Sequence, residues 1–186
     1  GDGIDNIFRD DQIEYGLDLT LKPTNNINFS INSSIENRTG FMQWVDIIDS
    51  QNGKFEDSNG RYDIIYAKTK RDQINHKVRL NVTFNPKMTF EAFYQPFNVD
   101  MNYEDYYRLN QKETFRTSSF NYEGNESFQI ENQRGTFVFR WEFRPGSLIY
   151  LVYNLNDNNY FSDEDNEWDD ERSNSLFMKL DYFLQP

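Results

Sequence analysis

Apolar and polar residues alternate with a period of two along much of this chain, which is the pattern of β-strands that bury one face. The first apolar series runs from Ile13 to Leu21, and the residues between its members are polar or glycine. A turn rich in proline and asparagine follows at 22–26, and alternation resumes over 27–31. Helical spacing hardly appears. We therefore predict an all-β fold of antiparallel, up-and-down strands.

The same pattern predicts seven further strands, which brings the expected total to nine. The clearest have one apolar and one polar face, at 77–84, 88–95, 137–143 and 176–184. Less regular strands are expected at 41–48, 61–70 and 148–154. Turns are predicted at 49–60, 71–72, 85–87 and 144–147.

Two long polar segments, 99–134 and 155–171, are predicted to be loops. Short turns that alternate with long loops are typical of outer-membrane β-barrels, in which the turns are periplasmic and the loops lie outside. A soluble, secreted β-sandwich is the alternative, because soluble antiparallel sheets also alternate.

Ionisable residues stand at mid-strand positions of the polar faces, where a water-filled lumen would tolerate them. The residues predicted to face a lumen are Lys77, Arg79, Glu91, Arg140, Glu142, Lys179 and Asp181. Cross-strand ion pairs that fix the strand register are the favoured interpretation of the charges on 140–144.

Composition narrows the choice of function. Acidic residues number 31 against 19 basic ones, so the net charge of −12 argues against nucleic acid as a partner. Cysteine is absent, which excludes disulfides and thiolate metal sites. Aromatic residues make up 17% of a chain with a mean hydropathy of −0.89, which suits strands with one aromatic face. The longest apolar run, 148–153, is too short for a membrane-spanning helix.

The ends of the sequence and the strand count suggest a piece of a longer protein. The chain starts at Gly1 without an initiator methionine or a signal peptide. Nine strands is an odd number, whereas bacterial single-chain barrels have an even number. We expect residues 1–186 to be a single C-terminal barrel region. Tyr182 and Phe183 near the terminus resemble the aromatic closing strand of outer-membrane proteins.

Candidate chemistry is sparse, and no residue is expected to be catalytic. The acidic segment offers a Ca²⁺ site at Asp163, Asp165 and Asp169, although it lacks EF-hand spacing and a solvated loop is the favoured interpretation. Four aromatic side chains could stack on a ligand or anchor the loops: Tyr106, Tyr107, Tyr160 and Trp168. Glu91 and Glu142 could supply the two carboxylates of a glycosidase, but the cations nearby favour ion pairs instead. His76 is the only histidine, which excludes a histidine metal cluster.

Three segments resemble the C-terminal region of the family called domain of unknown function 5916. They are Lys77–Phe97, Phe139–Tyr153 and Asn174–Phe183, and the stretch 140–147 is the most specific. The resemblance implies a protein of Bacteroidota with a signal peptide, a family-9-type carbohydrate-binding domain and a barrel-like region. That sugar-binding part would lie outside this chain, and the family has no established catalytic residues. Segments 99–134 and 155–171 fall outside the matching blocks.

Together these observations predict an outer-membrane β-barrel segment with its loops at the cell surface. It would be the scaffold or pore of a surface protein linked to glycan handling, with the lipid bilayer as a partner and glycans or other outer-membrane subunits as further ones. The first alternative is a soluble secreted β-sheet module that binds a polysaccharide or a protein. The second is part of a glycan-active hydrolase.

Overall fold

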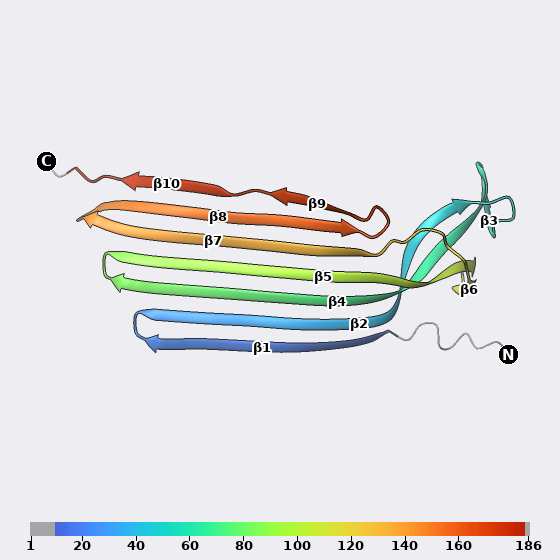
Figure 1. Cartoon of the computed structure of the whole chain (residues 1–186), viewed down its shortest axis with the longest axis horizontal. Helices are drawn as coiled ribbons and strands as arrows, with labels where there is room; N and C mark the ends of the chain where they lie inside the picture. The colour runs from blue at the N-terminus through green and yellow to red at the C-terminus, as the bar shows by residue number, and fades with distance from the viewer. Residues whose placement is uncertain (1–9, 185–186) are drawn as a thin grey trace.

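The chain folds into one antiparallel β-sheet, as a computed structural model that describes residues 10–184 shows (Figure 1). Seven strands follow one another in the order β1-β2-β4-β5-β7-β8-β10, and each pairs with the next. Three short strands attach to them: β3 to β4, β6 to β5 and β9 to β8. The predicted all-β, antiparallel, up-and-down fold is confirmed.

The strands are long. Their bounds are β1 Asp11–Thr24, β2 Ile27–Asp49, β3 Phe55–Asp57, β4 Gly60–Asn85, β5 Met88–Gln111, β6 Arg116–Ser119, β7 Phe128–Arg144, β8 Ser147–Ser162, β9 Glu167–Arg172 and β10 Ser175–Asp181. The sheet is open within residues 10–184, because β1 and β10 are its two edges and no pairing joins them.

Three tight turns lie at one end of the sheet, which we call the turn end (left in Figure 1). They fall at 25–26, 86–87 and 145–146, as the proline- and asparagine-containing patterns predict. The conformation of the Pro145–Gly146 turn follows from its two residues. Proline fixes φ at the first central position, and Gly146 takes a φ of 76°, as the second central position of a type II turn requires. At the 86–87 turn, the Asn85 side chain accepts a hydrogen bond from the Lys87 amide at 2.9 Å.

The other connections lie at the opposite end, the loop end, and here the predictions need correction. Segment 99–134 is mostly strand, because β5 continues to Gln111, β6 follows and β7 starts at Phe128. Segment 155–171 likewise contains the end of β8 and most of β9. The 49–60 connection, which was predicted as a turn together with 85–87 and 144–147, lies at the loop end and contains β3. Polar strands that extend beyond the apolar half of a sheet lose the alternation on which the prediction depended.

The same cause accounts for two strands that were split in the prediction. Strand β2 runs unbroken through 32–40, and β4 runs unbroken through the turn predicted at 71–72. Arg71 and Asp72 instead pair with Arg38 and Asn37 of β2 in a continuous register. Both faces are polar at this level, so a strand interior resembled a turn.

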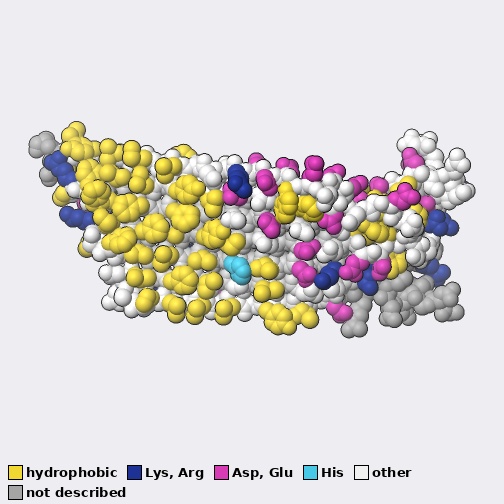
Figure 2. Space-filling view, viewed as in Figure 1, with side chains coloured by type: hydrophobic (Ala, Val, Ile, Leu, Met, Phe, Trp, Pro, Cys, Tyr) yellow, Lys and Arg dark blue, Asp and Glu magenta, His cyan; other side chains and the backbone are white. Residues whose placement is uncertain are grey.

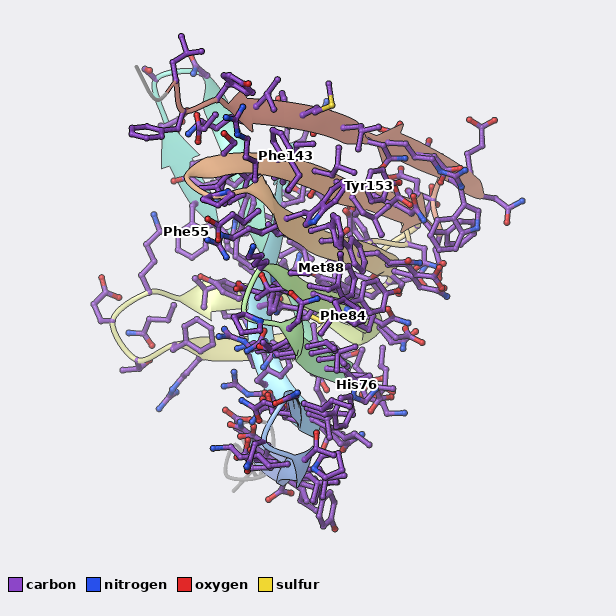
Figure 3. All side chains as sticks on the ribbon, turned by 90° about the vertical axis from the view of Figure 1, so that its left-hand side faces the viewer. Phe55, His76, Phe84, Met88, Phe143 and Tyr153 are labelled. Atoms are coloured by element: carbon purple, nitrogen blue, oxygen red, sulfur yellow. The ribbon has the colours of Figure 1, made fainter. Side chains whose placement is uncertain are left out.

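Beyond the long sheet, β2, β4 and β5 bend into a compact outer lobe, which comprises residues 40–69 and 102–127. Register shifts lie on both sides of β4, at 39–41 and 44–46 of β2 and at 103–105 of β5. Such bulges bend and twist strands. Gly40 has a φ of 81°, the left-handed conformation of a glycine bulge. The tip of the lobe, with Phe55, leans to the side of the sheet opposite His76 and Tyr153 (Figure 3).

Candidate functional site

One face of the sheet is apolar across all seven long strands in the half next to the turn end. Directly paired residues of antiparallel strands share a face, so the register identifies whole rows. One row joins β1 to β10 without a polar residue: Leu21, Phe29, Leu80, Ala92, Phe137, Tyr153 and Leu176. The next row toward the turns is Ile27, Val82, Phe90, Phe139, Leu151 and Met178. We call this surface the apolar face.

The apolar face is uncovered within the described part of the chain. Leu176 is 71% exposed, Met178 73% and Leu17 58%, which is unusual for large apolar side chains. Figure 2 shows these side chains gathered over the turn-end half, while Asp and Glu gather over the loop-end half. His76 lies at the border, hydrogen-bonded to the Ser33 hydroxyl at 2.8 Å. Residues 10–184 contain one sheet and no second layer, so the β-sandwich alternative is not the fold observed.

The opposite, polar face holds all seven residues that were predicted to face a lumen. Arg79 shares a row with Phe93 and Thr136, and Glu91 shares the next with Asn81 and Val138. Arg140 and Lys179 share a row through Tyr150, and Glu142 and Asp181 share one through Leu148. Lys77 lies two residues from Arg79 on β4. That this face lines a lumen stays a prediction.

Among residues 10–184, most of these charges lack the ion pairs that were expected. Lys179 and Asp181 form one at 2.9 Å. The Glu142 carboxylate accepts the Gly146 amide at 2.9 Å, and the Arg144 guanidinium donates to the Tyr182 hydroxyl at 2.6 Å. The expected ion-pair ladder on 140–144 is therefore wrong, because alternate residues of one strand point to one face and their opposite charges need partners on neighbouring strands. Thr89 and Tyr150 stand opposite Arg140. Leu148 stands opposite Glu142 on β8, and on β5 the Lys87 carbonyl accepts the Glu142 amide at 2.7 Å, but in the described sheet no ion pair joins these two side chains.

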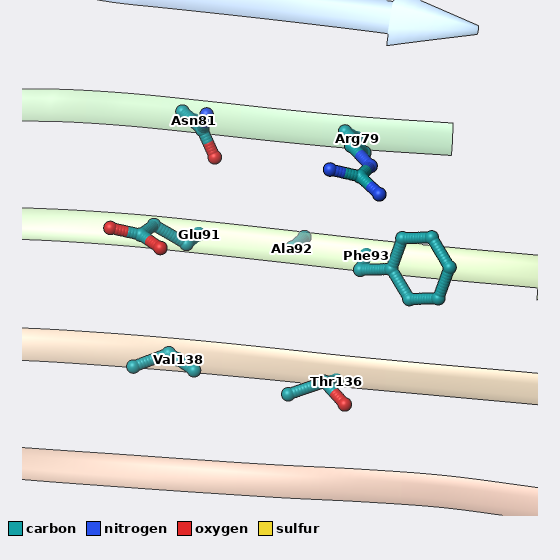
Figure 4. A pocket seen from close by; sticks show the side chains of 7 residues that line it. All are labelled: Arg79, Asn81, Glu91, Ala92, Phe93, Thr136 and Val138. Carbon is teal, nitrogen blue, oxygen red and sulfur yellow. The ribbon is translucent and has the colours of Figure 1, made fainter. Parts of the chain in front are cut away.

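An open depression of 370 Å³ lies on the polar face over β4, β5 and β7 (Figure 4). Its side chains are Arg79, Asn81, Glu91, Phe93, Thr136 and Val138, with Ala92 behind them. The Arg79 guanidinium lies over the Phe93 ring at 5.2 Å from its centroid. A second depression of 210 Å³ lies beside it toward the loop end, lined by Gln95, Phe97, Asn132 and Arg134.

The outer lobe has a small core of its own, built on the strand face that is polar farther down. Ile65, Ala67 and Thr69 of β4 are completely buried, and Asp63 is 3% exposed. Asp63 accepts the Lys54 amide at 2.9 Å and lies 3.6 Å from the Arg108 guanidinium. Nearer the sheet, Arg38 pairs with Asp10 and Arg71 pairs with Glu36.

Tyrosines tie the 120–127 segment to the sheet. Tyr122 packs on Tyr106 with 4.7 Å between ring centroids, and its hydroxyl donates to Glu126 at 2.8 Å. The buried Ser127 hydroxyl accepts the Tyr103 amide at 3.0 Å. Burial, followed by the neighbouring Glu126 carboxylate, raises the pKa of Tyr122 well above its usual value, and burial also raises the pKa of Tyr106. These tyrosines are thus structural groups that stay neutral.

Of the four aromatic residues predicted to stack on a ligand, Tyr160 and Trp168 line one open depression of 530 Å³, whereas Tyr106 and Tyr107 do not line it. Tyr106 contacts Tyr122, Tyr160 stacks on Phe128 at 5.6 Å, and Trp168 lies 5.2 Å from Phe161. Tyr107 follows Tyr106 in β5 and therefore points to the other face. These ring contacts favour the interpretation that the aromatic residues anchor the loop-end strands to one another.

The remaining candidates are the acidic residues, of which Asp165 and Asp169 line the same 530 Å³ depression as Tyr160 and Trp168. No three His, Asp or Glu side chains come together as metal ligands within residues 10–184, so Asp163, Asp165 and Asp169 make no Ca²⁺ site there. Asp163 instead accepts a hydrogen bond from Asn125 at 3.4 Å. Glu91 pairs with Val138, four residues from Glu142 along β7, which is about 13 Å of strand. A glycosidase pair is closer than about 10 Å, so these carboxylates are not placed for hydrolysis.

Two groups of residues escaped the sequence analysis. The first is Arg134, which lay in a segment predicted as a loop. Arg134 and Arg140 are an even number of residues apart, so a longer predicted strand would have placed both on one face. The ion pairs of Arg38 and Arg71 depend on register over more than 25 residues of chain, which no local pattern supplies.

The fold and its two surfaces define a class: a one-layer, amphipathic antiparallel sheet with short turns at one end and an acidic extension at the other. The chain belongs to the family described as Domain of unknown function (DUF5916), whose family model matches residues 4–185. That match confirms the resemblance noted from three short segments and extends it to nearly the whole chain. No curated protein matches, and no solved structure matches. In the described range no helix is long and apolar enough to cross a membrane.

Proposed function

We propose that this chain is a wall of an outer-membrane β-barrel, with the apolar face in lipid, the polar face toward water and the loop end at the cell surface. The uncovered row from Leu21 to Leu176 carries this proposal. A soluble sheet would bury such a row beneath a second layer. The hydrocarbon of a bilayer covers the row without a second layer of protein.

The dimensions support a membrane. Counted inclusively, the apolar series spans seven residues on β4, from Val78 to Phe84, and nine on β1, from Ile13 to Leu21. A tilted strand crosses the hydrocarbon core in about 9–11 residues. The tight turns adjoin this band directly, and the polar extensions of β2, β4 and β5 lie beyond it, as in barrels with short periplasmic turns and long outer loops.

Membrane placement has a consequence for the edges. Hydrocarbon offers no hydrogen-bond partner, so the free backbone groups of β1 and β10 must be paired by further strands. β1 and β10 run in the same direction (Figure 1), so direct pairing between them would be parallel. An antiparallel closure therefore needs an odd number of strands between them.

The wall would act as a scaffold or a pore. A link to glycans is supported by the family resemblance alone, since no contact in this structure favours a sugar. The hydrolase alternative is not proposed further, because Glu91 and Glu142 are far apart.

Vesicle flotation tests this proposal. Chain refolded with phosphatidylcholine vesicles is expected to float with the lipid and to stay there after a urea wash, because several strands are inserted and the free edges pair between copies of the chain. Without lipid or detergent it is expected to aggregate through its apolar face. A monodisperse 22.4 kDa chain in plain buffer that does not float would contradict the proposal.

A further inference from the structure

Four cationic side chains form a patch on the polar face, which we call the cationic patch: Lys77, Arg79, Arg134 and Arg140. Two belong to β4 and two to β7, on either side of β5. Neighbouring strands lie about 4.8 Å apart, so the two pairs face each other across roughly 10 Å. Along the strands, Arg134 and Arg140 are six residues apart, or about 20 Å.

The cationic patch is not neutralised by the protein. No carboxylate lies within 4.0 Å of any of the four cations in the part of the chain that the structure describes. The Arg79 guanidinium lies over the Phe93 ring. Glu91 lies between the two pairs and Glu142 lies two residues beyond Arg140 on the same face, so four positive and two negative charges leave a local charge of +2. This occurs in a chain whose net charge is −12.

Neutral hydrogen-bonding groups complete the surface. Asn81 and Thr136 line the 370 Å³ depression beside Arg79, and Gln95 and Asn132 line the 210 Å³ depression beside Arg134. Guanidinium forks with adjacent amides and hydroxyls recognise carboxylate, sulfate and phosphate oxygens. The Phe93 ring adds an apolar surface beneath the Arg79 guanidinium.

The acidic loop end does not cancel this field. The carboxylates nearest Arg134, Glu131 and Asp157, belong to the opposite face, because Asp157 pairs with Gln133 and Glu131 with Asn159. Asn156 is the β8 partner of Arg134, and Asp163 lies seven residues farther along the same strand direction. Seven residues span about 23 Å of strand, whereas the screening length at physiological ionic strength is about 8 Å. The patch therefore presents its own positive potential.

We propose that the cationic patch binds a small multivalent oxyanion, a solute that carries several carboxylate, sulfate or phosphate groups. The inference concerns the polar face alone and holds whether or not the apolar face lies in lipid. The two depressions lie four residues apart along β5 and β7, which is about 13 Å of strand, and this suits a ligand with charges at both ends better than a single monovalent ion.

Pyrene tetrasulfonate, a fluorescent tetra-anion, is the probe for a binding measurement with the full chain folded in an uncharged detergent. Replacing all four cations of the patch by glutamine is expected to weaken binding by about tenfold to a hundredfold, since each removes a fraction of a kcal/mol to 1 kcal/mol. The matched control replaces four exposed cations away from the patch, Lys22, Lys54, Lys112 and Arg116, by glutamine. It changes the net charge equally and is expected to alter binding less than about twofold.

Two smaller changes keep the test decisive if the fourfold variant fails to fold. Glu91→Gln is expected to tighten probe binding by about threefold, because it removes the negative charge that lies between the two pairs of cations. Arg134→Gln alone is expected to weaken it by a similar factor. Equal losses in patch and control variants, or an unchanged affinity in both single variants, would overturn the proposal. Vesicle flotation of the same variants reports on membrane insertion separately.

Discussion

Phe139→Arg is expected to destabilise the membrane-inserted sheet by about 2–4 kcal/mol, the cost of a cation near the middle of a bilayer. Phe139 lies in the second apolar row, between Phe90 and Leu151. An arginine side chain at this position would lie in the hydrocarbon and could reach water only by extending along the strand. Urea unfolding of the chain in phosphatidylcholine vesicles measures the loss.

Val138→Arg is the matched control, because Val138 is also apolar, adjacent in β7 and similarly half-buried. It lies on the polar face beside Glu91, where a guanidinium meets water and a carboxylate. We expect a change below about 1 kcal/mol. Similar losses at the two positions would contradict the assignment of the faces.

Ile65→Ala is expected to destabilise the outer lobe by about 2–5 kcal/mol, the range for truncating a fully buried isoleucine. Ile65 is completely buried, and a cavity there would be lined by Ala67 and the other core residues of the lobe. A single-tryptophan variant that keeps Trp44 of β2 reports on this lobe, with Trp141 and Trp168 replaced by phenylalanine.

Ile47→Ala is the control for this second change. Ile47 is 52% exposed on the neighbouring strand β2, so its truncation is expected to cost less than about 1 kcal/mol. If Ile65→Ala left the Trp44 transition unchanged, the outer lobe would have no packed core, and the segment predicted as a loop would behave as one.

The apolar half of the sheet could be predicted from the sequence because one face of every strand there is apolar. The hairpin around 86–87 shows this: Leu80 and Val82 alternate with polar residues, and so do Phe90 and Ala92, so parity alone identifies both faces. The seven charged residues were placed on one face by the same parity. Their location did not require any knowledge of the partner strands.

The polar half could not be predicted in this way. Around Arg71 and Asp72 neither face is apolar, so a period of two leaves no trace in the hydrophobicity. What holds β4 there is register, with Arg71 bonded to Glu36 and Asp72 to Asn37. The outer lobe depends on bulges such as that at Gly40, whose effect on direction appears only when the strands are paired. Three members of the cationic patch could be predicted, but Arg134 could not, because it lay in this region.

A nitroxide scan along β8 tests the central claim most directly. The chain has no cysteine, so single cysteines at 148–154 carry the label without a background. In vesicles, we predict oxygen access to peak at Ile149, Leu151 and Tyr153, and access of an aqueous nickel chelate to peak at Leu148, Tyr150 and Val152. High nickel access at all seven positions would show that both faces meet water, and it would contradict placement of the apolar face in lipid.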